Sequence, residues 1–320
     1  MVSQLPGWDS FIGGNVLRSQ LQPVSIPLDI ENLLSSPDNP LLDPALPPSE
    51  PQAPLPLATE AFPPPAPPAF TPKADENPIW TGWDVLLIAV LTLGILFLVQ
   101  LVVIFGAHRL AYPRQSWTEV AQKPVLALIA ELVAYVVVGL YMVLLIEVKY
   151  RSRFWPSIRW NWPGVAGFSL LGVGVLMLGF DMLGRFLPMP KTTPFDQFFD
   201  SPMDAYLTAA FAITLGPLME EIFFRGFLYP VLARRTGVFW GIVLTAVPFG
   251  AMHFMQYRSW SAVLIIFLVG VVLTTVRAVT KSVGCSFLAH VGYNGTLMVL
   301  AAVATNGFRH MEKAGLLVGY

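Results

Sequence analysis

Long apolar runs constrain the fold of this 320-residue chain more than any other feature. Beyond Trp80 the sequence repeats apolar stretches of about 20 residues, the length that an α-helix needs to cross the hydrocarbon core of a bilayer. Backbone polar groups inside lipid must be satisfied within the protein, so such runs form helices. Only 12% of the residues are charged, about half the share found in soluble domains. The pattern predicts an all-α, polytopic transmembrane helical bundle of about seven or eight helices.

The predicted spans differ in how regular they are. Trp80 and Trp83, just before the first span, are expected to lie at the membrane interface as aromatic anchors. Glycines in the third span, Gly174 among them, favour close helix packing. Pro217 interrupts the fourth span, and we expect a kink there that puts Glu220 and Glu221 in the first turn of a new segment. The expected spans lie near 84–106, 124–147, 164–187, 204–233, 238–256, 260–279 and 284–304.

Residues 1–79 have a different composition from the rest of the chain. They hold 18 of the 29 prolines, and nine acidic residues against two basic ones. Proline removes backbone donors and disfavours helix in the residue before it, so this stretch is predicted to be a disordered, acidic, Pro-rich tail. It lacks the basic start and the continuous apolar run of a secretory signal. We expect no nucleic-acid partner for the protein.

A small set of polar residues lies within the later apolar runs. Each ionisable group in hydrocarbon costs about 2.5–3.5 kcal/mol even on a lenient scale, so these groups are expected to face one another. Residues four positions apart share a helix face, which predicts an ion pair between the second glutamate and the arginine and a common direction for the last histidine and the asparagine. The set comprises Glu220, Glu221, Arg225, His253, His290 and Asn294.

These residue types favour acyl hydrolysis by an activated water molecule. A carboxylate paired with a histidine can orient and deprotonate water. An amide together with a second imidazole can donate hydrogen bonds to the oxyanion that forms when water attacks a peptide carbonyl. No His-Glu-x-x-His motif occurs, so the helix pattern of zinc metalloproteases is absent. Ser286 lacks a Gly-x-Ser-x-Gly context, which leaves a serine mechanism with little support.

Three motifs together resemble the CAAX protease and bacteriocin-processing family, which includes type II CAAX prenyl endopeptidases and lysostaphin-resistance-like proteins of bacteria. The resemblance covers roughly residues 204–304. The motifs occur in the family's order on successive apolar segments: Glu220-Glu221-x-x-x-Arg225, Phe249-x-x-x-His253 and His290-x-x-x-Asn294.

The resemblance implies an intramembrane endopeptidase of the glutamate type, located as a multi-pass protein in a membrane, the plasma membrane of a bacterium. Its partners would be the lipid bilayer and a membrane-associated protein or peptide substrate, prenylated in some family members and unknown in many bacterial ones. The implied roles are water activation by Glu220 and His253, support from Glu221 held by Arg225, and an oxyanion site of His290 and Asn294.

With this resemblance the chain divides into four parts. Residues 1–79 are the tail, residues 80–200 the N-terminal transmembrane helices, residues 201–305 a catalytic core resembling a CAAX protease, and residues 306–320 a C-terminal tail.

Other readings of the same residues stay open. One is a non-catalytic membrane partner or bacteriocin-immunity-like protein that keeps the polar core for packing. Another is a metal-dependent protease in which two glutamates and two histidines bind a divalent ion, although no cofactor is our first expectation. A proton-coupled transporter ranks last because no inverted repeat is visible. Glu131 and Asp181 are intramembrane acids outside the motifs, and each is expected to have a structural partner, Arg185 in the case of Asp181.

Overall fold

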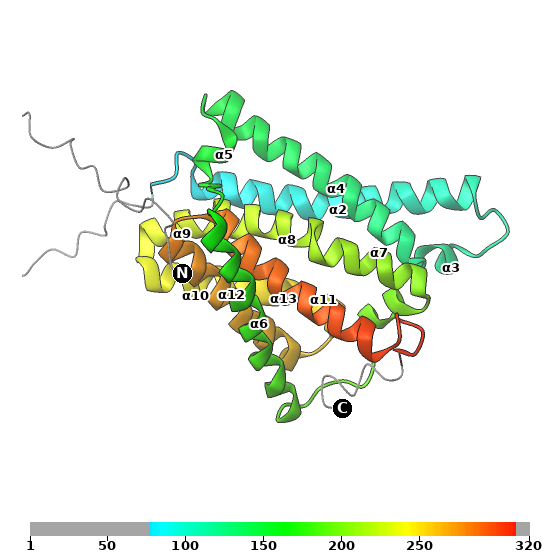
Figure 1. The fold of residues 1–320 in the computed structure, drawn as a ribbon. Coiled ribbons are helices and arrows are strands. Elements are labelled where there is room, and N and C mark those ends of the chain that lie inside the picture. The colour runs from blue at the N-terminus through cyan, green and yellow to red at the C-terminus, as the bar shows by residue number, and fades with distance from the viewer. Residues whose placement is uncertain (1–76, 312–320) are drawn as a thin grey trace, which may run out of the picture. The chain divides into compact units, whose positions relative to one another are not determined.

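The computed structural model describes residues 77–311, so most of the two predicted tails lies outside the described residues. These residues belong to one compact unit and contain helices and no strand. The helices, in chain order (Figure 1), are α2 (Gly82–Leu110), α3 (Trp117–Ala121), α4 (Pro124–Leu144), the π-helical turn η2 (Leu145–Lys149), α5 (Phe154–Ser157), η3 (Val165–Phe168), α6 (Ser169–Met177), η4 (Leu178–Arg185), η5 (Pro194–Phe199), α7 (Pro202–Ile213), α8 (Leu215–Glu220), the π-helix η6 (Glu221–Leu228), α9 (Tyr229–Thr236), α10 (Val238–Met252), α11 (Phe254–Tyr257), α12 (Trp260–Thr280) and α13 (Val283–Ala304).

The multi-pass membrane fold predicted from the apolar runs is confirmed. Within the described part of the chain, six helical segments are long and apolar enough to cross a membrane. Helix α2 packs along α4 (Figure 1) but leaves most of its apolar side chains exposed, including Leu93 and Phe97. An apolar helix surface without a protein neighbour fits contact with lipid. The six segments are Gly82–Leu110, Pro124–Lys149, Pro202–Thr236, Val238–Tyr257, Trp260–Thr280 and Val283–Ala304.

The third predicted span, 164–187, does not form one continuous α-helix. Its α-helical part, α6, has only nine residues, which span about 14 Å, against roughly 30 Å of hydrocarbon. Tighter 3-10 turns, η3 and η4, precede and follow it. The segment is rich in glycine, which disfavours a helix by about 1 kcal/mol per residue relative to alanine. Hydrophobicity alone therefore overestimated the regularity of this segment.

Glycines instead let α6 approach α13 very closely. A Cβ atom added at Gly174 would lie 2.3 Å from the carbonyl oxygen of Ala289, and one at Gly292 would lie 2.4 Å from the carbonyl oxygen of Leu171. Such distances exclude any side chain at either position. The close packing expected at Gly174 is thus present, and it fixes α6 against the helix that carries His290 and Asn294.

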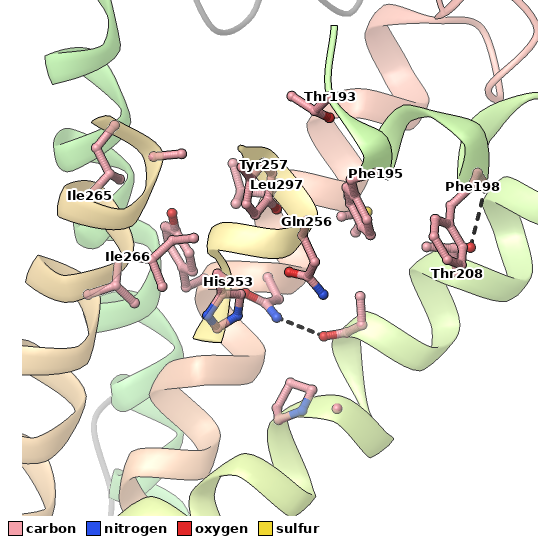
Figure 2. A pocket seen from close by; sticks show the side chains of 18 of the residues that line it. Thr193, Phe195, Phe198, Thr208, His253, Gln256, Tyr257, Ile265, Ile266 and Leu297 are labelled. Atoms are coloured by element: carbon pink, nitrogen blue, oxygen red, sulfur yellow. Dashed lines mark hydrogen bonds between the residues drawn. The ribbon is translucent and has the colours of Figure 1, made fainter. Parts of the chain in front are cut away.

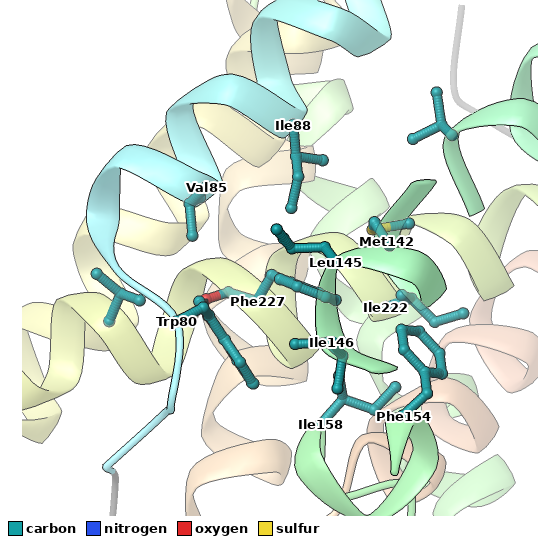
Figure 3. Packing of buried hydrophobic residues seen from close by; sticks show 12 residues of the cluster. Trp80, Val85, Ile88, Met142, Leu145, Ile146, Phe154, Ile158, Ile222 and Phe227 are labelled. Carbon is teal, nitrogen blue, oxygen red and sulfur yellow. Dashed lines mark hydrogen bonds between the residues drawn. The ribbon is translucent and has the colours of Figure 1, made fainter. Parts of the chain in front are cut away.

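A buried apolar cluster joins the first helices to the helix that carries the glutamates (Figure 3). Trp80 is part of it, with 1% of its surface exposed, and its indole donates a hydrogen bond to the carbonyl oxygen of Phe227 at 3.0 Å. The prediction that Trp80 is an interfacial anchor is therefore wrong. The neighbouring Trp83, at 78% exposed, has the exposure expected of such an anchor. Tertiary packing against Phe227 therefore decides which tryptophan is buried.

The α6–α13 contact predicts different effects for two neighbouring glycines. Gly174→Ala should destabilise the protein by about 1–3 kcal/mol, because the new methyl group would overlap the backbone of α13. Gly172→Ala is the matched control: nothing lies within 4 Å of its added Cβ, and the change should be neutral or stabilise the helix by up to about 1 kcal/mol. Thermal unfolding in detergent would measure both. Equal melting temperatures for the two variants would contradict this packing.

Candidate active site

The helix that carries the glutamates is broken before them, as its proline predicts, but Glu220 does not lie in the first turn after the break. Helix α7 ends at Ile213, Thr214 departs from helical geometry, and α8 restarts at Leu215. Glu220 is the last residue of α8, and Glu221 begins the π-helix η6. The predicted first-turn location is therefore wrong for Glu220, which lies in the second turn after the break. The change from α to π geometry falls between the two glutamates, whose side chains point about 100° apart as consecutive residues of a helix.

Glu221 is enclosed by hydrogen-bond donors. Its side chain has no exposed surface. Arg225 Nη1 lies 2.8 Å from Glu221 Oε1, so the ion pair expected from the spacing is present. His290 Nδ1 lies 2.9 Å from the same oxygen, and the Ser286 hydroxyl donates to Oε2 at 2.6 Å. Three donors from two helices thus satisfy a carboxylate that would otherwise be very costly to bury.

Arg225 links this carboxylate to the neighbouring helix α12. The guanidinium is fully buried, and it also donates to the Thr274 hydroxyl at 3.2 Å and to the Gly270 carbonyl at 3.1 Å. Its Cζ atom lies 4.3 Å from the ring centre of Phe249, a cation–π contact. A Cβ at Gly270 would meet that ring at 2.8 Å. The small residue at 270 is what allows the ring to pack between the arginine and α12.

Glu220 faces two imidazoles rather than the arginine. Its Oε1 lies 3.9 Å from His253 Nε2 and its Oε2 lies 3.7 Å from His290 Nε2. The carbonyl oxygen of Phe249 lies 2.8 Å from His253 Nδ1. A carbonyl can only accept, so Nδ1 carries the hydrogen and the Nε2 of a neutral His253 presents a lone pair. Glu220 and His253 therefore present two acceptors to the space between them.

Asn294 lies one turn beyond His290 on α13, as the spacing predicts. Its amide Nδ2 donates to the carbonyl oxygen of Ala212 at 2.8 Å, close to the break between α7 and α8. An amide group carries two N–H donors, so this contact orients the side chain and leaves one hydrogen for another acceptor. The break in the helix supplies the carbonyl that holds Asn294.

A cavity of about 470 Å³ opens at these residues. Glu220, His253, His290 and Asn294 line it, whereas Glu221 and Arg225 lie behind its wall. His253 and Gln256 reach it from the end of α10 and from α11, and Phe195 and Phe198 of η5 border another side (Figure 2). Apolar side chains such as Ile265, Ile266 and Leu297 make up much of the rest. A concave, largely apolar site with a few convergent polar groups is typical of ligand binding.

Sequence reasoning missed two residues that hold the site together. Ser286 was considered only as a nucleophile, yet it is fully buried and bonds Glu221. Thr274 is likewise fully buried and bonds Arg225. The available signal was spacing, because Ser286 is one turn before His290 and so points to the same side of α13. For Thr274 no local signal exists, since its role depends on how α12 packs.

The two remaining intramembrane acids pair with tyrosines. Tyr135 donates to Glu131 Oε1 at 2.7 Å, and Tyr293 donates to Asp181 Oδ1 at 3.1 Å. The expected pairing of Asp181 with Arg185 is wrong, because Arg185 is exposed and the Tyr293 hydroxyl takes that place. Both acids, with both tyrosines, line the same cavity as Glu220.

Comparison with known families now supports the resemblance drawn from the motifs. Residues 202–296 match the family described as "Type II CAAX prenyl endopeptidase Rce1-like". The matched segment includes all three motifs, and the predicted family resemblance is confirmed for these residues. The match assigns this segment to a family of peptidases, and the six apolar helices agree with a multi-pass membrane protein. Neither a curated protein nor a solved structure matches the chain.

The buried ion pair predicts that Arg225→Met is strongly destabilising, by about 3–5 kcal/mol, because it leaves the Glu221 carboxylate without its cation. The double variant Glu221→Gln/Arg225→Met should recover part of that loss, since it removes the uncompensated charge. Thermal unfolding of the purified protein in detergent checks both. Arg185→Met, at an exposed arginine, is the control and should change the melting temperature little. A double variant no more stable than Arg225→Met would argue against this view of the pair.

Proposed function

We propose that the protein is an intramembrane endopeptidase that hydrolyses a peptide bond with a water molecule activated by Glu220 and His253. The observation that carries the proposal is the pair of acceptors, Glu220 Oε1 and His253 Nε2, 3.9 Å apart at the wall of the cavity. Two acceptors cannot hydrogen-bond to each other, because neither carries a hydrogen. A water molecule has two hydrogens and can bridge them, with its oxygen lone pairs free for attack.

Proton transfers follow from this arrangement. As the water oxygen bonds to the carbonyl carbon, Glu220 accepts a proton from the water, and His253 orients the molecule through its second hydrogen. The carbonyl oxygen becomes an oxyanion. When the carbon–nitrogen bond breaks, the proton held by Glu220 passes to the leaving amine, so that one water is consumed and one new acid and one new amine are formed.

His290 and Asn294 are the donors proposed for the oxyanion. The free amide hydrogen of Asn294 and the Nε2 side of His290 are both at the cavity wall. Donation by His290 requires hydrogens on both ring nitrogens. Glu221 lies at Nδ1 and Glu220 at Nε2, so the ring has a carboxylate near each nitrogen. Preorganised donors of this kind typically contribute a factor of about 10²–10³ each to the rate.

Glu221 and Arg225 would act as positioning residues. Both are behind the cavity wall, where their contacts hold His290 and the start of η6 in place. The substrate supported by these features is a membrane-associated protein or peptide. The family name speaks of prenyl substrates, and an apolar cavity suits a lipid-modified peptide, prenylated or otherwise. We propose the plasma membrane of a bacterium as its location.

Loss of either acceptor should abolish hydrolysis. Glu220→Gln removes the base, and His253→Ala removes the group that orients water, so each should lower kcat by at least about 10². A suitable probe is an internally quenched peptide in detergent or vesicles, with a prenylated cysteine fourth from its C-terminus. Comparison of C-terminal peptides from membranes of cells with wild type and Glu220→Gln extends the test to natural substrates.

Expression and membrane insertion of the two variants should equal those of wild type, which is the control for folding. Retained cleavage in both variants would reject this mechanism. A non-catalytic membrane partner would instead keep its cellular effect after Glu220→Gln and lose it only when the fold is lost.

Metal dependence is tested separately. Within residues 77–311 no group of three or more His, Cys, Asp and Glu side chains is arranged to hold a metal ion, and Glu221 and one nitrogen of each histidine already have protein partners. We therefore expect full activity after chelator dialysis. Elemental analysis of the active protein should find no stoichiometric metal. Activity that disappears with the chelator and returns with zinc would favour the metal-dependent alternative.

A further inference from the structure

Helix α4 contributes a carboxylate to the cavity that lies outside the family motifs. Glu131 and Tyr135 are one turn apart on α4, and both line the cavity together with Glu220. The segment that matches the peptidase family begins at residue 202. These two side chains therefore belong to the part of the chain for which the family suggests no role.

Glu131 is held by one contact and open on its other side. The Tyr135 hydroxyl donates to Oε1 at 2.7 Å, and the Tyr135 ring stacks on Phe211 of α7 with 5.6 Å between ring centres. Oε2 makes no hydrogen bond to the residues that the structure describes, and it is not among their buried unpaired atoms. The tyrosine thus fixes the carboxylate while leaving one oxygen available to the cavity.

A purely structural role explains this arrangement poorly. An acid in a membrane span costs about 2.5–3.5 kcal/mol, and structural acids recover that cost from cations and several donors. Glu221 is such a case, with Arg225, His290 and Ser286 around it. Glu131 has one neutral hydroxyl within hydrogen-bonding distance and forms no ion pair in residues 77–311. The open oxygen of Glu131 at the cavity wall can therefore accept a hydrogen bond from a donor on a bound ligand.

We propose that Glu131, held by Tyr135, is a positioning residue that accepts a hydrogen bond from an N–H donor of the peptide bound in the cavity. The inference rests on the proposed peptidase function. Every residue of a peptide except proline carries a backbone N–H, which loses water when it enters a largely apolar cavity and must find an acceptor there. The donor is either such a backbone N–H or the ammonium or guanidinium of a basic side chain.

The kinetic test separates binding from chemistry. With the quenched prenylated peptide as probe, Glu131→Leu should raise KM about 10-fold, the size expected when one hydrogen bond to a charged group is lost. The value of kcat should stay within about 3-fold, because Glu220 and His253 are untouched. Tyr135→Phe, which frees the carboxylate to move, should raise KM less. Glu131→Gln keeps an acceptor oxygen and should fall between Glu131→Leu and wild type.

Matched controls come from α4 and from η2, the turn that continues it. Glu147→Leu and Tyr141→Phe remove the same groups at positions that do not line the cavity, and they should leave KM unchanged. Melting temperatures in detergent identify any variant that fails to fold. A KM for Glu131→Leu equal to that of wild type, or a loss confined to kcat, would overturn the inference while leaving the peptidase function intact.

Modified peptides identify the donor, and a binding measurement tests the inference without requiring turnover. If the donor is a backbone N–H, methylation of that one peptide nitrogen should weaken binding of the peptide to the wild-type protein but not to Glu131→Leu. If the donor is a basic side chain, replacement of a peptide lysine by norleucine should weaken binding to the wild-type protein but not to Glu131→Leu. Binding of the same probe to Glu220→Gln should weaken about 10-fold on addition of Glu131→Leu. Unchanged binding there rejects the inference, whether or not the wild-type protein cleaves the probe.

Discussion

The buried carboxylate of Glu221 is the constraint on which the site depends. An ionisable group without exposed surface in a membrane protein requires partners, and here they come from three helical elements: Arg225 from η6, His290 and Ser286 from α13, and α12 through the second set of contacts of Arg225. Separation of α12 or α13 from η6 would leave buried donors and acceptors of this network without their partners, at a cost of about 1–3 kcal/mol for each group. The network therefore connects η6, which directly follows Glu220, to α13, which carries His290 and Asn294.

Two adjacent glutamates have different environments because consecutive side chains on a helix point about 100° apart. Glu220 ends α8 and lies at the cavity wall, while Glu221 starts the π-helix and is enclosed by donors. In the proposed mechanism this difference separates the tasks: one carboxylate is free to exchange a proton, and the other is held ionised to orient a histidine. The break at Thr214 adds the Ala212 carbonyl, which holds Asn294.

Features encoded locally could be predicted from the sequence, and features decided by packing could not. Apolar runs of sufficient length identified six spans, and helical spacing identified the contact between Glu221 and Arg225. Burial of Trp80, by contrast, depends on a carbonyl 147 positions away, and the position of α6 depends on close backbone contact with α13. The partner of Asp181 was misjudged for the same reason. Helical spacing favours Arg185 as the partner of Asp181, but Tyr293, which is distant in sequence, donates the hydrogen bond to this carboxylate.

The cavity also shows why the matched segment alone says little about the substrate. All residues proposed for the chemistry lie within residues 202–296, whereas a large part of the cavity wall comes from α4, η4 and η5, which precede that segment. Hydrolysis needs the same carboxylate, imidazoles and amide whatever peptide is cut, but recognition depends on the groups around them. Glu131 with Tyr135, and Asp181 through Tyr293, give this wall polar groups in an otherwise apolar surface. Under the proposed function, residues outside the family motifs are where this peptidase would distinguish one membrane peptide from another.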